Sequence, residues 1–165
     1  VWGGQPLIHA EEFIAMVQQY PVCIAWLNGH THINTITAHT KKDGVGGFWE
    51  ITTASCVDFP QQQQLVELVD NRDGTLSIFV TSLDHAASPT WTPGDLSQSG
   101  LASLSRELAA NAWLNEPALR AGSALDRNVE LLMPAPIDLG AITDAAIEAE
   151  QMKARAQLLA HGGAA

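Results

Sequence analysis

Residues 21–39, with the sequence PVCIAWLNGHTHINTITAH, place the strongest constraint on how this chain can fold. Val22 to Leu27 carry no charge and include β-branched and aromatic residues, which predicts a buried strand with Cys23 as a small core residue. Asn28-Gly29 predicts a turn directly after it, because glycine reaches backbone angles that a side chain forbids. Residues 33–38 alternate apolar and polar, which predicts a half-exposed strand leaving the turn.

Two histidines, His30 and His32, lie between these predicted strands. Neutral imidazole is a good ligand for zinc, iron and manganese. Because alternate residues on an ideal strand point to one face, both rings could reach one metal ion or two adjacent ions. The alternative is a polar turn with solvated histidines, since two ligands do not complete a site of four or more.

The surrounding sequence carries a family resemblance. Besides Asn28-Gly29-His30-Thr31-His32, the segments that fit are residues 46–55, 58–62, 73–78, 105–109 and 126–131. Together they resemble the C-terminal portion of the calcineurin-like metallophosphoesterases, in an actinobacterial-type branch, over roughly residues 5–133. The resemblance implies an α/β fold that is part of a layered αββα sandwich, mostly an antiparallel meander with flanking helices. Residues 134–165 are then expected to form a helical C-terminal tail.

The resemblance also implies a chemistry. Members hydrolyse phosphate esters at a site of two divalent metal ions (Mn, Fe or Zn), and His30 and His32 match ligands of one ion each. Gly29 would give the backbone room for the turn, and His39 is a candidate second-shell residue that orients a ligand. No catalytic residue is assigned, because the proton donor of the family comes from a motif that this sequence lacks.

Earlier motifs of the family are absent from the sequence. It contains no Asp-x-His and no Gly-Asn-His, and Gly94-Asp95 follows Pro93 in a predicted loop rather than a strand. We therefore expect a C-terminal fragment that is inactive alone, with most metal ligands in a missing N-terminal part of the same domain. Two alternatives are a non-catalytic module that associates through exposed sheet edges, including self-association, and a mononuclear metal site completed by His30, His32 and a ligand outside the family pattern, such as His39.

Charge and composition exclude some functions. Against 8 Lys and Arg there are 18 Asp and Glu, for a formal net charge of −10, so no nucleic-acid partner is expected. The sequence shows neither a signal peptide nor an apolar run long enough to span a membrane. The family branch often carries an export signal, so the resemblance favours a secreted or cell-envelope parent protein, while the sequence itself leaves the localisation unknown.

Hydrophobic periodicity predicts the remaining elements. Helices are expected at residues 10–20, 101–114 and 142–159, and strands at 33–39, 48–53, 65–70, 75–83 and 128–133. Asp73-Gly74 predicts a hairpin tip between two of the strands. We expect residues 33–83 to form one meander of four antiparallel strands.

Overall fold

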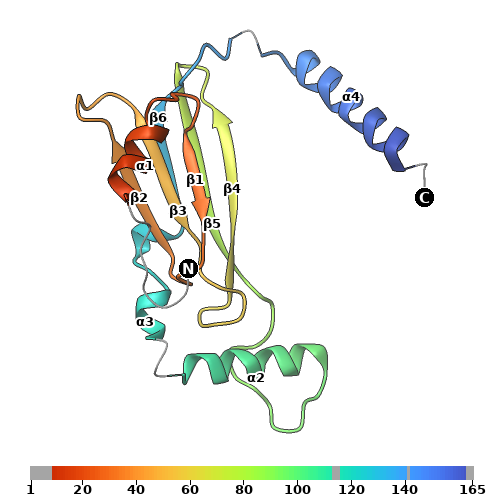
Figure 1. The fold of residues 1–165 in the computed structure, drawn as a ribbon. Coiled ribbons are helices and arrows are strands. Elements are labelled where there is room, and N and C mark those ends of the chain that lie inside the picture. The colour runs from red at the N-terminus through yellow and green to blue at the C-terminus, as the bar shows by residue number, and fades with distance from the viewer. Residues whose placement is uncertain (1–8, 113–115, 141, 163–165) are drawn as a thin grey trace.

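A computed structural model describes residues 9–112, 116–140 and 142–162 and shows a mixed α/β protein with two small sheets and flanking helices (Figure 1). In chain order the elements are α1 (Ala10–Val17), β1 (Ala25–Asn28), β2 (Thr35–Thr40), β3 (Gly47–Thr52), β4 (Gln62–Asp70), β5 (Thr75–Asp84), α2 (Gln98–Ala110), α3 (Pro117–Arg120), the short 3-10 helix η2 (Ala124–Asp126), β6 (Val129–Pro134) and α4 (Asp144–Gly162). The predicted α/β class is confirmed. The predicted end of the second long helix at Leu114 lies outside the described residues.

The strands divide between two three-stranded sheets. The first sheet has the order β1-β3-β2, in which β1 runs parallel to β3 and β2 runs antiparallel to it. The second sheet, β4-β5-β6, is antiparallel throughout, and its β4–β5 hairpin confirms the turn predicted at Asp73-Gly74. The predicted single meander is wrong, because β3 and β4 belong to different sheets. Alternation identifies a strand and its buried face but leaves its pairing partner open.

A core shared by both sheets holds them together. Alternate residues of β5 and β6 point to one face of the second sheet, where they meet a fully buried isoleucine of β3. The buried cluster consists of Ile51, Leu76, Ile78, Val80, Leu131 and Met133. Burial of one such side chain contributes about 1.5–3 kcal/mol, so this cluster is the main source of cohesion between the sheets.

Strand β1 departs from the prediction of a buried strand at residues 22–27. It begins only at Ala25, Val22 and Cys23 are exposed, and Leu27 is 58% exposed. The physical reason is position: β1 lies at the end of the first sheet and, among the described residues, pairs only with β3. Helix α1 contacts β1 through one aromatic pair, in which the Phe13 ring lies 4.4 Å from the Trp26 ring, centroid to centroid.

Helix α4 extends away from both sheets (Figure 1). Its described side chains are exposed, in agreement with the weak apolar stripe of its sequence. No helix in the described part of the chain is both long enough and apolar enough to cross a membrane.

Asp126, at the end of η2, connects η2 to β2, an outer strand of the first sheet. Its Oδ1 accepts a hydrogen bond from the Ile36 backbone N–H at 2.9 Å, and its Oδ2 accepts from the Ser123 N–H and hydroxyl. Burial of Asp126 raises the pKa of its carboxyl, but the bonds from Ser123 and Ile36 and the charge of Arg127 lower it further, so the net pKa lies below the usual value. The ionised form is therefore the one that stabilises this junction.

We expect Asp126→Asn to lower the free energy of unfolding by about 1 kcal/mol near pH 7, because an amide cannot accept all three hydrogen bonds. Since the folded-state pKa is depressed, this stabilisation is complete above the unfolded-state value of 3.8 and is lost as the pH falls through the lower folded-state pKa. Urea unfolding of both proteins from about pH 7 to about pH 3 should show the difference shrinking at the acid end. Glu148→Gln on exposed α4 is the control. A difference that stays constant with pH would contradict the assignment.

Candidate metal-binding site

The two motif histidines lie just beyond β1, in irregular backbone. His30 and His32 both have left-handed backbone conformations, with φ of 72° and 58°. Such angles are uncommon for residues with a side chain and cost about 1–3 kcal/mol each. The prediction that strand alternation points both rings to one face is therefore wrong in its reasoning, since neither residue is on a strand.

Gly29 does not have the role predicted for it. Its φ is outside the left-handed region, and a Cβ placed on it would lie 3.9 Å from its closest neighbour, the Thr53 carbonyl oxygen. That distance is an ordinary van der Waals contact. The turn thus places its strained angles on the histidines, and glycine's conformational freedom is not what the motif requires.

His32 contacts a carboxylate that sequence patterns did not single out. Its Nδ1 lies 2.5 Å from Oδ2 of Asp58, which belongs to the loop between β3 and β4. The same Oδ2 lies 3.7 Å from the guanidinium of Arg120, at the end of α3. Arg120 also donates to the carbonyl oxygens of Thr31 and His32, at 3.2 and 3.5 Å. These contacts bring together three chain segments around His32, whereas His30 is exposed.

Asn34 is the buried hub behind this loop. Its side chain is fully buried, and its Oδ1 accepts from the Ala54 N–H at 2.8 Å. Its Nδ2 donates to Gln62 Oε1 at 3.0 Å and to the Ala121 carbonyl at 3.4 Å. Its backbone N–H donates to the carbonyl of Arg120 at 3.0 Å. One amide side chain therefore ties the segment after the motif to the β3–β4 loop and to the end of α3.

Gly122, two residues after α3, packs closely against Asn34. Gly122 has a φ of 68°, and a Cβ there would lie 2.4 Å from the Asn34 carbonyl oxygen. Only glycine satisfies both the backbone angle and the available space.

His39, the candidate second-shell residue, lies near the far end of β2. Its Nε2 is 2.7 Å from one oxygen of Glu50, whose other oxygen accepts from Asn28 Nδ2 at 2.7 Å. Its ring also stacks on Phe48. The structure therefore links His39 through Glu50 to Asn28, two residues before His30, and its role in orienting a ligand stays a prediction.

The glutamine run at 61–64 has a separate partner for each of three side chains. Gln61 donates to Ser105, Gln62 to Asp84, and Gln64 accepts from Thr53. Like Asn34, Asp58 and Arg120, these residues carry no distinctive sequence signal, since the same letters are typical of solvated loops and turns. Their partners lie far along the chain, so no local spacing could have found them.

Within residues 9–112, 116–140 and 142–162, no three His, Cys, Asp or Glu side chains form a group that could hold a metal ion. Within these residues the mononuclear site of His30, His32 and His39 is not supported, since the three do not form such a group and His39 lies near the far end of β2. Two imidazoles remain, and their chemistry fits part of a larger divalent-metal site.

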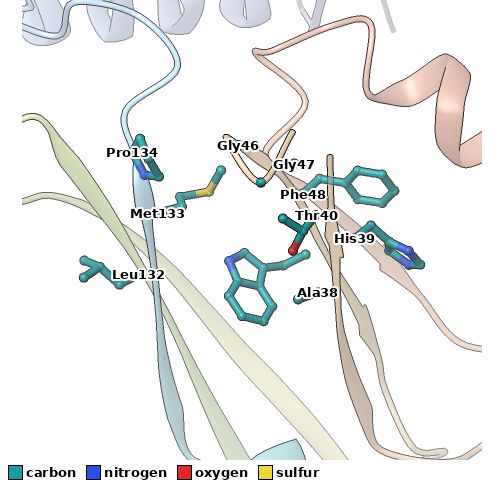
Figure 2. A pocket seen from close by; sticks show the side chains of 11 residues that line it. Ala38, His39, Thr40, Gly46, Gly47, Phe48, Leu132, Met133 and Pro134 are labelled. Atoms are coloured by element: carbon teal, nitrogen blue, oxygen red, sulfur yellow. The ribbon is translucent and has the colours of Figure 1, made fainter. Parts of the chain in front are cut away.

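A surface pocket near the opposite end of β2 includes His39 with Phe48 and Met133 (Figure 2). It lies between the 46–47 turn of the first sheet and the end of β6. Its lining does not include either motif histidine. The pocket therefore shares His39 with the candidate site but does not extend to His30 or His32.

Comparisons with protein-family models, curated proteins and solved structures found no match for this chain.

We expect Asn34→Ala to reduce the free energy of unfolding by about 2–4 kcal/mol, because it leaves the buried Ala54 N–H and other polar partners unsatisfied. Urea unfolding measures this change. Gly29→Ala is the matched control in the same loop and should change stability by less than about 1 kcal/mol, since its Cβ has room. An Asn34→Ala protein as stable as the control would show that the hub is not needed.

Proposed function

We propose that this chain is the C-terminal portion of a calcineurin-like metallophosphoesterase, in which His30 and His32 each ligate one of two divalent metal ions. The observation that carries the proposal is the pair of left-handed histidines directly after β1. Strained conformations persist only where the surrounding structure enforces them, and they concentrate at functional sites.

The arrangement of the sheets supports the proposed αββα architecture. The two sheets share one core, and α1 packs on β1 at the first sheet. In the described residues, the second edge of β1 is unpaired, and β1 already runs parallel to β3. This edge is where a strand from an N-terminal part of the same domain would add.

The side chains of this chain would contribute ligands and position them. When bound, the metal ions supply Lewis-acid activation of a phosphate ester and of the attacking water. His30 and His32 would hold the ions through ring nitrogen lone pairs, and imidazole suits manganese, iron or zinc. Two ligands cannot complete a two-ion centre, so we expect residues 1–165 alone to be inactive or nearly so. An N-terminal part would supply the remaining ligands and the proton donor.

The first test combines metal binding with activity. We expect residues 1–165 to bind Zn²⁺ weakly in a calorimetric titration, and the His30→Ala, His32→Ala variant to lose that binding, because the two rings are the proposed ligands. With added Mn²⁺, neither protein should hydrolyse p-nitrophenyl phosphate or bis(p-nitrophenyl) phosphate.

Replacing His85 with Ala removes an imidazole outside the motif and serves as the control, with Zn²⁺ affinity unchanged. Equal Zn²⁺ affinity in the wild type and the double variant would contradict the ligand assignment. Turnover by the wild type but not by the double variant would show that the essential ligands are already present in these residues.

A second candidate function is a non-catalytic assembly module. The observation that favours it is exposed apolar surface on the edge strand β4, where Leu65 is 46% exposed, Leu68 58% and Val69 40%. Edge strands with unpaired backbone groups and apolar side chains favour association with another chain. The associating chain would be a second copy or the N-terminal part of the same domain.

Self-association predicts a solution mass of twice 17.6 kDa by light scattering. Leu68→Lys should then restore the monomer mass, because a charge on an edge strand opposes pairing. Leu158→Lys, at an exposed leucine of α4, is the matched control and should leave the dimer intact. A wild-type protein with the mass of a single chain would exclude self-association.

A further inference from the structure

We propose that Asp58 is a positioning residue that fixes the tautomer of His32, so that Nε2 is the nitrogen presented to a metal ion, and that Arg120 holds Asp58 in place. This inference rests on the proposed function, since it concerns the same site. It assigns roles to two residues that the motif itself does not contain.

The tautomer follows from the chemistry of the contact. An ionised carboxylate only accepts hydrogen bonds, so the ring nitrogen facing Asp58 at 2.5 Å must carry the proton. In a neutral imidazole the other nitrogen, Nε2, then carries the lone pair that ligates a metal. Metal-ligating histidines commonly donate their second ring N–H to a carboxylate in this way, which orients the ring and raises its basicity.

The carboxylate is itself fixed. Asp58 is 29% exposed and Arg120 18%, so both groups of this ion pair are partly withdrawn from water. The guanidinium of Arg120 also donates to the carbonyls of Thr31 and His32, which belong to the peptide groups before and after the His32 Cα. Arg120 therefore fixes both the acceptor of the His32 ring and the backbone from which that ring projects.

The backbone of Arg120 is anchored independently of its side chain. Its carbonyl accepts from the Asn34 N–H, and the adjacent Ala121 carbonyl accepts from the Asn34 side chain. Because the buried hub sets the position of the residue-120 backbone, the guanidinium reaches the loop from a defined point. A lysine there would keep the charge but lose the planar fork that serves several acceptors at once.

The test reads the tautomer and the metal affinity separately. Long-range ¹H–¹⁵N NMR near pH 8 distinguishes the protonated ring nitrogen of each histidine, and the His32→Ala variant assigns the His32 signals. We expect the wild type to show the Nδ1–H form at His32 and Asp58→Ala to shift it toward Nε2–H. The Zn²⁺ affinity of Asp58→Ala should fall by about 10- to 100-fold, as is typical for loss of such a partner.

Two further variants sharpen the test. Asp58→Asn retains an oxygen acceptor and should keep the Nδ1–H form with a smaller loss of affinity, and it carries the test if Asp58→Ala does not fold. Arg120→Lys should weaken Zn²⁺ binding while leaving the fold, followed by circular dichroism, intact. Asp43→Ala, in the exposed turn between β2 and β3, is the control and should change neither readout.

The outcomes separate this inference from the proposed function. An unchanged His32 tautomer in Asp58→Ala would overturn the positioning role. The same holds if Asp58→Asn keeps the tautomer but loses as much Zn²⁺ affinity as Asp58→Ala does. A shifted tautomer with unchanged Zn²⁺ affinity would also overturn it. If the His30→Ala, His32→Ala variant binds Zn²⁺ as well as the wild type does, the proposed function fails, whatever the tautomer of His32.

Discussion

The structure around the candidate site depends on one buried amide. Asn34 has no exposed surface, and in a low-dielectric interior each of its polar atoms must find a partner. It finds them on the β3–β4 loop, at Gln62 and at the end of α3. These are the segments that bring Asp58 and Arg120 to His32. The requirement to satisfy Asn34 therefore fixes the relative position of chain segments up to 87 residues apart in sequence.

Sequence patterns predicted the elements better than their arrangement. Alternation located the strands that are β2 and β4, and Asp73-Gly74 located the hairpin, because side-chain period and turn chemistry are local properties. The sequence does not reveal that β3 and β4 belong to different sheets, because this depends on how the buried faces of the two sheets pack together. In the structure, Ile51 of β3 packs against buried residues of the second sheet. The uncharged run at 22–27 was mistaken for a buried strand for a related reason, because composition does not reveal that β1 lies at a sheet edge.

The same limit applies to the candidate site. His30 and His32 could be found from the sequence, since the strand, the turn and the spaced histidines are adjacent. The role of Gly29 could not be found from the sequence. Whether a turn needs glycine at a position depends on the φ of that residue and on the space for a Cβ there. Asp58 lies 26 residues from His32 and Arg120 lies 88 residues from it, so no spacing rule connects them. Asp58 lies in residues 58–62, a segment that contributes to the resemblance, but the sequence assigns no role to Asp58 or Arg120.

The backbone strain at the histidines and the contacts around them explain each other. A left-handed residue at His32 is unfavourable alone, yet the Thr31 carbonyl before it and its own carbonyl both accept from Arg120, and its ring is held by Asp58. These contacts over-determine the conformation, which is the condition under which strain is retained. All of them are made by protein groups. The position of the His32 ring is therefore set by the fold itself, and a metal ion would meet a ligand that is already oriented.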